Sequence, residues 1–413
     1  MHTFFITDLP KSESNIETFL NETVSIVSHS GLHPTELLLI AQLARLPASP
    51  TSLLIAGNRT GATALAATVQ FPGCAITCHT FDVHHARAIL RNLAANHQPA
   101  AFLHDPYVTL SSDLSFPTSD LSLPTSDLRP PTATVACTAQ IPPGTYAAAF
   151  FMATPGTMTG ELILDQLEDI HRNLAPGGTC VIACQAESGP LIKQIKAIFG
   201  NLSVCFDKQG LLCATAVKKE ALKRERDFSS VFPASLSGGE TLSLCSQPGV
   251  FCHRRPDTGG LALAEIAARE LRPGQSVLDM GCGCGLVGIL LARAQPDTRV
   301  TFVDSHARAC AATHRNLETL GLRGHALTLS DTGTDQTGFD LFAGNPPYYS
   351  DFKIATLFIN TAYAALRPGG TCLLVAKSTR QLEEKLQATF GNAEVLPRRG
   401  YSVVRSVRRN RNE

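Results

Sequence analysis

The sequence predicts an α/β protein made of two tandem copies of one doubly wound fold. Short apolar, β-branched runs alternate with longer helix-like segments, which is the pattern of parallel strands joined by crossover helices. The same landmarks also occur twice in the same order. An apolar run ending in glycine lies at 53–57 and 277–281, and a segment Leu-x-Pro-Gly-Gly-Thr-Cys lies at 174–180 and 366–372. Two such copies fit a chain of 413 residues.

Composition sets the broad class of the protein. Hydrophobic residues make up 44% of the chain and charged residues 17%, which is enough apolar material for packed cores and excludes a mainly disordered chain. The formal net charge is zero, which excludes a protein that coats nucleic acid by bulk charge alone. However, residues 250–413 hold 20 of the 35 basic residues and 15 of the 35 acidic ones. This imbalance indicates that the C-terminal half meets an anionic partner.

The sequence also predicts where the protein works. No apolar run approaches the roughly 20 residues that a membrane-spanning helix needs, and residues 1–12 lack the pattern of a signal peptide. The thirteen cysteines lie mostly in apolar, strand-like runs such as 179–182 and 371–374, without the paired spacing of zinc ligands. We therefore expect reduced cysteines in a cytoplasmic protein, with no metal site and no membrane partner.

The two copies set the expected domain boundaries. The first is expected at residues 1–217 and the second at 236–413, with a linker at 218–235 that begins with a charge-dense run. Three tandem seven-residue repeats rich in Ser, Thr and Pro occupy residues 112–132. Such low-complexity sequence has little to bury, so we expect a surface insertion in the first domain.

The second copy shows the alternation of strands and helices most clearly. Its first strand, 276–279, is an apolar run that leads into a glycine-rich turn, and the helix 286–294 follows the turn. A strand at 299–304 and an amphipathic helix at 307–320 repeat the unit. The remaining elements are expected in this order: strand 326–330, strand 339–343, helix 358–366, strand 371–375 and strand 401–407. Doubly wound sheets bind ligands outside the carboxyl ends of their strands.

The glycine-rich turn after the first of these strands is a candidate binding site. Gly281, Gly283 and Gly285 allow a tight turn and let a ligand approach the backbone closely. With a further glycine at 288, the turn also fits the dinucleotide fingerprint, which alone is a weak signal. Asp279, just before the glycines, could accept a hydrogen bond from a cationic amino group. Asp304 ends the next strand, where a carboxylate can accept from ribose hydroxyls.

The segment Asn345-Pro346-Pro347-Tyr348 is more specific than the glycine turn. It follows the strand 339–343, at the edge where a parallel sheet would place it next to the nucleotide site. The two prolines fix the backbone and remove two N–H donors, which leaves carbonyls and the Asn345 amide oxygen as acceptors. Acceptors suit a planar exocyclic amine, and Tyr348 offers a flat face on which a base can stack. Nicotinamide chemistry does not explain this segment.

The glycine turn and the Asn-Pro-Pro-Tyr segment together resemble the class I methyltransferases that use S-adenosylmethionine (SAM) and modify exocyclic amines and amides. With Gly249-Val250-Phe251, Asp257-Thr258-Gly259 and 366–370, the pattern is similar to the guanine-N2 ribosomal RNA methyltransferases. The resemblance covers 249–413 well and 1–217 only in outline. It implies two Rossmann-like class I methyltransferase domains, of which the N-terminal copy is degenerate.

The resemblance implies a role for each site residue. Asp279, Gly281, Gly283 and Gly285 would hold the methionine part of SAM, Asp304 the ribose, and Asp331 would lie by the adenine amine. Asn345 and the Pro346 carbonyl would bind the target amine, Pro347 would stiffen the segment, and Tyr348 would stack on the guanine. The expected reaction is methyl transfer to the N2 amine of a guanine in ribosomal RNA, and the small-subunit (16S) rRNA is the expected substrate. Arginines between 398 and 411 are candidates for contacts with RNA phosphates.

The first copy lacks the residues that carry this chemistry. Ile55 stands where the second copy has Asp279, and Arg59 stands where it has Gly283. The segment 153–156, Ala-Thr-Pro-Gly, replaces Asn-Pro-Pro-Tyr. We expect a scaffold that binds no SAM and that supports folding, RNA docking or both.

Other functions stay open at this stage. The same site chemistry could act on a large-subunit guanine, on adenine N6 or on a protein glutamine. A non-catalytic RNA-binding or assembly module is a different class of function, and an oxidoreductase that uses NAD is a third. The sequence does not predict the oligomeric state.

Overall fold

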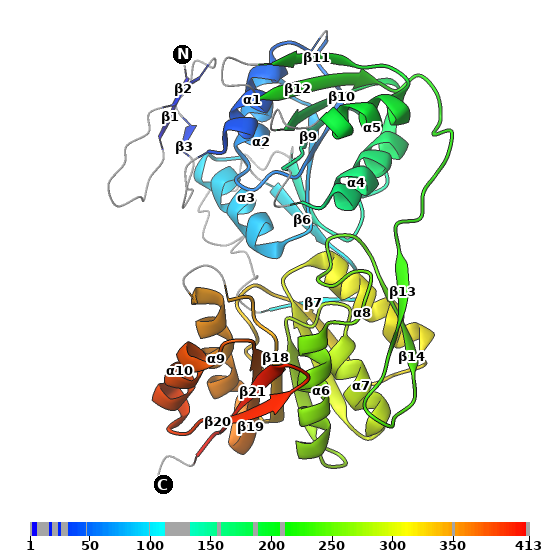
Figure 1. Cartoon of the computed structure of the whole chain (residues 1–413). Helices are drawn as coiled ribbons and strands as arrows, with labels where there is room; N and C mark the ends of the chain where they lie inside the picture. Colours follow the sequence, from blue (N-terminus) through cyan, green and yellow to red (C-terminus); the bar gives the residue numbers. More distant parts are fainter. Residues whose placement is uncertain are drawn as a thin grey trace. The chain divides into compact units, whose positions relative to one another are not determined.

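The computed structural model describes residues 2–5, 16–18, 24–25, 32–46, 48–98, 100–111, 133–154, 158–184, 189–206, 211–348 and 352–409. The chain forms two compact units (Figure 1). The first unit comprises Met1–Asp105 and Thr118–Phe228, and the second comprises Pro106–Pro117 and Ser229–Glu413. The division after Phe228 lies inside the expected linker, and the repeats at 112–132 lie outside the described residues.

The first unit is built around an eight-stranded sheet with the strand order β11-β12-β10-β9-β4-β5-β8-β6. Its strands are β4 (Ser52–Ala56), β5 (Ala75–Thr80), β6 (Ala100–His104), β8 (Ala133–Cys137), β9 (Tyr146–Met152), β10 (Leu174–Cys184), β11 (Ser203–Phe206) and β12 (Leu212–Val217). Its helices are α1 (Pro34–Leu43), α2 (Ala62–Gln70), α3 (Val83–Ala95), α4 (Gly160–Asn173) and α5 (Gly189–Phe199). A separate small sheet joins β1 (His2–Phe5), β2 (Ile16–Thr18) and β3 (Val24–Ser25).

The second unit contains a sheet with the order β20-β21-β19-β18-β15-β16-β17-β7. Its strands are β7 (Thr109–Leu110), β15 (Ser276–Met280), β16 (Arg299–Asp304), β17 (Ala326–Leu329), β18 (Phe339–Gly344), β19 (Leu366–Ala376), β20 (Glu394–Arg398) and β21 (Tyr401–Val407). Its helices are α6 (Thr258–Glu270), α7 (Leu286–Ala294), α8 (Ala307–Thr319), α9 (Lys353–Ala365) and α10 (Arg380–Phe390). A hairpin of β13 (Ser230–Ala234) and β14 (Leu242–Ser246) precedes α6.

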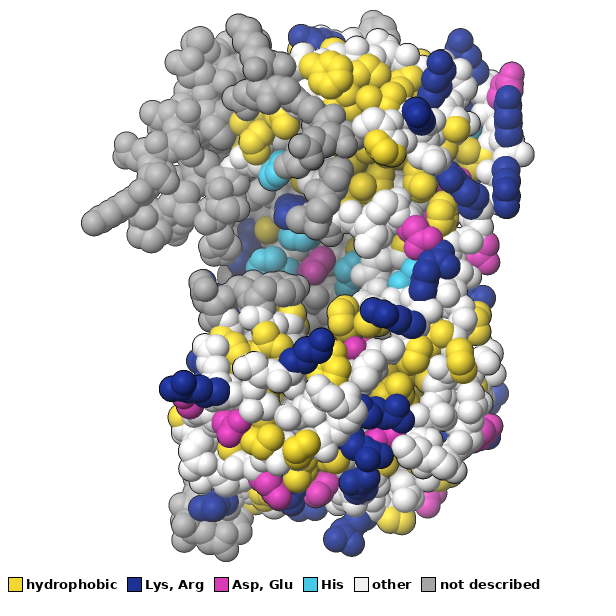
Figure 2. Space-filling view, viewed as in Figure 1, with side chains coloured by type: hydrophobic (Ala, Val, Ile, Leu, Met, Phe, Trp, Pro, Cys, Tyr) yellow, Lys and Arg dark blue, Asp and Glu magenta, His cyan; other side chains and the backbone are white. Residues whose placement is uncertain are grey.

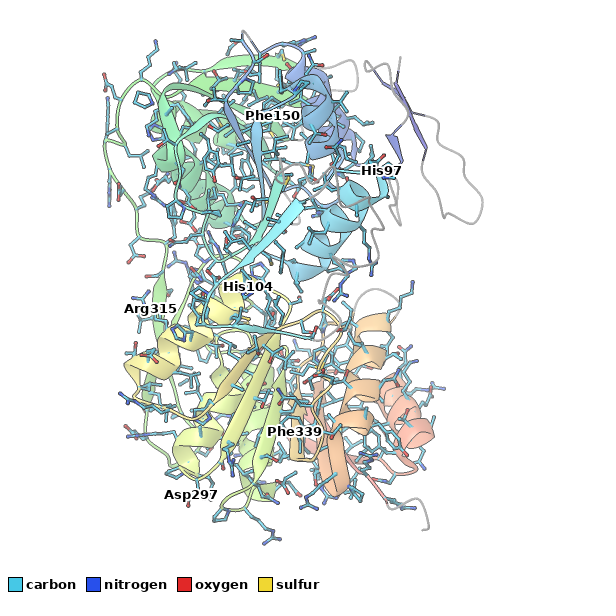
Figure 3. The ribbon with its side chains drawn as sticks, turned by 180° about the vertical axis from the view of Figure 1, so that it is seen from behind. His97, His104, Phe150, Asp297, Arg315 and Phe339 are labelled. Atoms are coloured by element: carbon cyan, nitrogen blue, oxygen red, sulfur yellow. The ribbon has the colours of Figure 1, made fainter. Side chains whose placement is uncertain are left out.

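The two sheets confirm the predicted duplication. Six strands have the same order in both sheets, β11-β12-β10-β9-β4-β5 and β20-β21-β19-β18-β15-β16, and only the last two strands at one edge are connected differently. In each sheet the strand next to the other edge runs antiparallel to its neighbours, namely β12 and β21. Phe150 in β9 and Phe339 in β18 mark the corresponding strands (Figure 3). In the second unit α6, α7 and α8 lie on one side of the sheet, and α9 and α10 lie on the other (Figure 1). This is the doubly wound α/β architecture.

One edge strand of the second sheet comes from an unexpected part of the chain. β7 pairs in parallel with β17, with Thr109 opposite Thr328. The Thr109 hydroxyl donates to the Leu327 carbonyl at 3.1 Å, and Tyr107 stacks on His314 with ring centroids 4.3 Å apart. A short segment within the expected first domain therefore completes the sheet of the second unit.

Most described cysteines and C-terminal arginines have structural roles. Ten of the thirteen cysteines are buried, as predicted, and all thirteen are free in the structure. Arg398 and Arg399 both pair with the buried carboxylate of Glu265 on α6. Burial would raise the pKa of Glu265, but hydrogen bonds from Arg399, Ser237 and Arg398 outweigh it and hold the pKa at about 2. These two arginines thus tie β20 and its turn to α6.

Basic and acidic side chains are interspersed over the surface in view (Figure 2). Arg405 pairs with Glu270 at 3.2 Å and with Glu394 at 3.4 Å.

Within the described residues, no helix is both long and apolar enough to cross a membrane.

Candidate active site

The candidate site lies at the carboxyl ends of β15, β16 and β18. β15 pairs in parallel with β16 on one side and with β18 on the other. The chain moves from β15 outward through β16 to β17 and then returns to β18, so the order of the strands reverses next to β15. Doubly wound sheets form their ligand crevice at such a reversal.

The glycine turn that follows β15 requires its glycines for different reasons. Gly281, Gly283 and Gly285 all have positive φ, at 70°, 59° and 82°. A Cβ on Gly281 would lie 2.9 Å from the Phe358 ring, and one on Gly285 would lie 2.7 Å from Ile289. A Cβ on Gly283 would meet only Val250, at 4.0 Å. Gly281 and Gly285 therefore face packed neighbours, whereas Gly283 borders open space that a ligand can occupy.

Asp279 is buried beneath this turn. Asp279 lies in β15 and is 2% exposed. One of its carboxylate oxygens accepts a hydrogen bond of 2.8 Å from the N–H of Gly288, in the first turn of α7. The pKa of Asp279 is raised to about 7, mainly because the carboxyl is buried. The hydrogen bond from the Gly288 N–H acts against this shift, and the nearby charge of Asp304 adds to it. The carboxylate therefore anchors the helix that follows the turn, and a cation would favour its ionised form.

Asp304 connects the end of β16 to the glycine turn. Its carboxylate accepts from the Gly283 N–H at 2.9 Å through one oxygen and from the His306 N–H at 2.9 Å through the other. Burial raises the pKa of Asp304, while these backbone donors lower it. Asp331 follows β17, one strand further from β15, and is partly exposed.

Asn345 follows β18, and its amide is held by a second residue. The amide Nδ2 donates to Oδ2 of Asp257 at 2.6 Å. Asp257 is the N-cap of α6, and its carboxylate also accepts from the backbone N–H groups of Gly259 and Gly260. The glycine turn, Asp304 and Asn345 thus lie on the ends of three adjacent strands.

The rest of the Asn-Pro-Pro-Tyr segment packs against the sheet. Pro346 is buried and Pro347 is partly exposed. The Tyr348 hydroxyl donates to the Val375 carbonyl at 2.7 Å, and the ring lies tilted against Phe352 with centroids 5.4 Å apart. Burial raises the pKa of Tyr348, so the phenol stays protonated. Its hydroxyl is a structural donor, and the ring is partly exposed.

Two further residues support the turn, and neither was predicted from the sequence. The Asn316 amide on α8 donates to the carbonyls of Cys284 and Cys245, both at 2.9 Å. Thr313 donates to the Gly283 carbonyl at 2.9 Å. A signal for Asn316 was present, because the sequence Arg-Asn-Leu occurs in both copies, at 91–93 and 315–317. In the first unit Asn92 donates in the same way to the Thr60 carbonyl at 2.6 Å.

Comparisons with known proteins identify the family. Residues 241–405 match the family described as "Methyltransferase small domain". The ribosomal RNA small subunit methyltransferase C of Shewanella loihica is 30% identical over 233 residues, which cover 54% of this chain and 67% of that protein.

The chain belongs to the ribosomal RNA small subunit methyltransferase C family.

Other members of this methyltransferase C family match a smaller share of the chain. The protein of that name from Pseudomonas entomophila is 31% identical over 172 residues, which cover 40% of this chain and 51% of that protein. The alignments with such curated relatives span about half of the relatives' length. A T. thermophilus 16S rRNA N2 methyltransferase, solved with AdoMet and guanosine, superposes with a TM-score of 0.70 at 21% identity and covers 98% of both chains. The fold of both units is therefore a class I methyltransferase fold.

The equivalent turn in the first unit of this methyltransferase C family chain is filled by its own side chains. Ile55, fully buried in β4, replaces the carboxylate of the second unit. The Asn58 side chain accepts from the N–H groups of Thr60 and Gly61, at 2.9 and 2.8 Å. The Thr60 hydroxyl donates to the buried Glu36 at 2.8 Å. Side chains of the first unit thus stabilise this turn from within.

Proposed function

We propose that this protein transfers a methyl group from SAM to the N2 amine of a guanine in ribosomal RNA of the small subunit. The observation that carries the proposal is the position of Asn345, at the end of the strand next to the open glycine turn. The names of the family members and the AdoMet and guanosine bound to the T. thermophilus enzyme support the same reaction. Such an enzyme would act in the cytoplasm, where ribosomes are assembled.

The residues of the glycine turn fit SAM. The space beside Gly283 can admit the ligand, Asp279 offers a buried carboxylate for its ammonium group, and Asp304 lies where ribose hydroxyls need an acceptor. Asp331 would lie by the adenine amine. Bound SAM supplies a methyl group that its sulfonium makes electrophilic.

The chain's own residues would position the target amine. The guanine amine is a poor nucleophile, because its lone pair is delocalised into the ring. The Asn345 amide oxygen and the Pro346 carbonyl would accept its two hydrogens and favour a pyramidal nitrogen that points at the methyl group. Pro346 and Pro347 keep these acceptors rigid, and the partly exposed ring of Tyr348 would support the base. This is catalysis by orientation and fixed dipoles.

The experiment that tests the proposal is transfer of labelled methyl from SAM to 30S subunits, 50S subunits and protein-free rRNAs, followed by separation of the nucleosides. Label in N2-methylguanosine of 16S rRNA is the expected result. Label in 23S rRNA, in N6-methyladenine or in protein glutamine would keep the chemistry and change the substrate. No transfer to any acceptor, together with no SAM binding by calorimetry, would favour a non-catalytic assembly module.

Because burial raises the pKa of Asp279, we expect SAM binding to depend on pH. Its pKa of about 7 in the folded protein lies above the usual value near 4, so the folded state holds an extra proton between these values. The stability that this carboxyl contributes is complete below about pH 4 and is lost as pH rises through 7. A ligand ammonium next to it would favour ionisation, so we expect binding at pH 6 to release a proton.

Calorimetry of SAM binding in buffers of different ionisation enthalpy measures that proton release. The variant Asp279→Asn keeps an acceptor for the Gly288 N–H but cannot ionise, so its binding should release none and should be weaker at pH 8. Equal proton release by the variant and the wild type would show that Asp279 is not the partner of the ammonium group.

A further inference from the structure

We propose that Asp257 is a positioning residue of the methyl-transfer site, which fixes the Asn345 amide so that its oxygen is the atom presented to the target amine. The proposal rests on the function proposed above. Asp257 lies 88 residues before Asn345 and on a different element, and the two side chains meet through a hydrogen bond of 2.6 Å.

The Asp257 carboxylate is itself held in place by the start of α6. Its Oδ2 accepts from the Gly260 N–H at 2.6 Å, and its Oδ1 accepts from the Gly259 N–H at 3.3 Å. A Cβ on either glycine would lie 3.2–3.3 Å from Oδ2, so the glycines let the backbone donors approach closely. The helix N-terminus also favours a negative charge at this position. Asp257 is therefore a rigid, charged acceptor.

The chemistry of the pair determines which way the amide faces. An ionised carboxylate only accepts hydrogen bonds, so only the NH₂ side of the Asn345 amide can face Asp257. The opposite orientation would set two oxygens against each other. The amide oxygen is therefore turned away from Asp257 and remains available as an acceptor. A charged partner on the NH₂ group also polarises the amide and strengthens that acceptor.

The first unit shows that capping of this helix does not require the Asp–Asn pair. Its equivalent helix, α1, starts after His33, whose Nδ1 accepts from the Thr35 N–H at 3.3 Å. The cap is thus retained there in another form. Neither member of the Asp–Asn pair is present, since residues 153–156 read Ala-Thr-Pro-Gly. The cap is kept in both units, and the pair occurs only in the unit that has the open glycine turn.

The test uses the full chain and the rRNA acceptor that the wild type methylates. Asp257→Ser keeps a good N-cap but is too short to reach the amide. We expect it to lower kcat by about 10- to 100-fold while the KM for SAM stays within about twofold, because orientation rather than cofactor binding is lost. Asp257→Asn, whose oxygen can still accept from the amide, should fall between the wild type and Asp257→Ser.

Two controls separate positioning from folding. Asp82 caps α3 in the first unit by accepting from the His84 N–H at 2.8 Å, so Asp82→Ser makes the same change at a helix start outside the site. Its melting temperature should change about as little as that of Asp257→Ser, and its kcat should match the wild type. In the background of Asn345→Ala, Asp257→Ser should have no further effect on kcat, because the amide it orients is gone.

The outcomes distinguish the inference from the proposed function. Wild type that methylates no acceptor overturns the proposed function, and the inference with it. If the wild type is active and Asp257→Ser keeps the full kcat, the inference about Asp257 is overturned and the proposed function stands. An equal loss from Asp257→Ser with and without Asn345 would assign Asp257 a purely structural role and would also overturn it.

Discussion

Asn345→Ala is expected to lower kcat for methyl transfer by about 10²-fold or more, the effect of removing one group that stabilises a transition state in a preorganised site. The alanine removes the acceptor that aims the amine nitrogen and leaves Asp257 without its partner. The KM for SAM should hardly change, because Asn345 ends β18 whereas the glycine turn follows β15. Single-turnover rates at saturating SAM, with calorimetric SAM affinity, measure the two quantities separately.

A substitution in the degenerate unit is the matched control for Asn345. Thr154 lies in the segment of the first unit that replaces Asn-Pro-Pro-Tyr, two residues after the end of β9, so Thr154→Ala should leave methyl transfer unchanged. If Asn345→Ala kept the wild-type kcat, the amide would have no role in the reaction, and the acceptor chemistry proposed for the site would be wrong. If both variants lost activity equally, the loss would reflect folding.

The features predicted best from the sequence depend on local patterns. The glycine turn and the places of Asp279 and Asp304 on the strands beside it were predicted because a strand that runs into closely spaced glycines can be read within about a dozen residues, and the binding roles given to these residues stay predictions. The helix α7 and the strands β16 and β21 have their predicted bounds, since each is a single periodic or alternating run. The duplication was visible because both copies keep the same landmarks in the same order.

The features that were missed depend on contacts between distant residues. β7 contributes only two residues to the second sheet, and nothing within the segment 106–111 signals that it pairs with β17. The partners of the arginines are similarly hidden. Arg398 and Arg399 suggested RNA contacts, but Glu265 reaches both of them from α6. Such ion pairs are set by tertiary packing and leave no local pattern.

The closest packing around the glycine turn involves Gly288, on the first turn of α7. A Cβ at this position would lie 2.4 Å from the Phe302 ring of β16 and 2.8 Å from Val300. The first unit handles the same crossing differently. It has Ala64 on α2 at the equivalent position and Cys78 on β5 where the second unit has Phe302. The second unit thus pairs glycine on the helix with a large residue on the strand, and the first unit pairs the larger alanine with the smaller cysteine.

Gly288→Ala is therefore expected to destabilise the protein by about 1–3 kcal/mol through overpacking, although alanine is the better helix former by up to about 1 kcal/mol. Scanning calorimetry of the variant and the wild type measures this change in the free energy of unfolding. Gly160→Ala is the matched control, because Gly160 starts α4 and a Cβ there would meet nothing within 4 Å, so its stability should hardly change.

The strand partner of Gly288 provides the decisive comparison. Phe302→Cys alone should cost about 3–5 kcal/mol, as truncation of a fully buried phenylalanine does. Combined with Gly288→Ala, it recreates the pair found in the first unit, and the double variant should lose less than the sum of the two single losses. Strict additivity would mean that the Phe302 ring is not what a Cβ at 288 meets, and Val300, 2.8 Å from that position, is then the candidate. Because alanine keeps the N–H that donates to the buried Asp279 carboxylate at 2.8 Å, the size of the coupling measures the packing of position 288 against Phe302 alone.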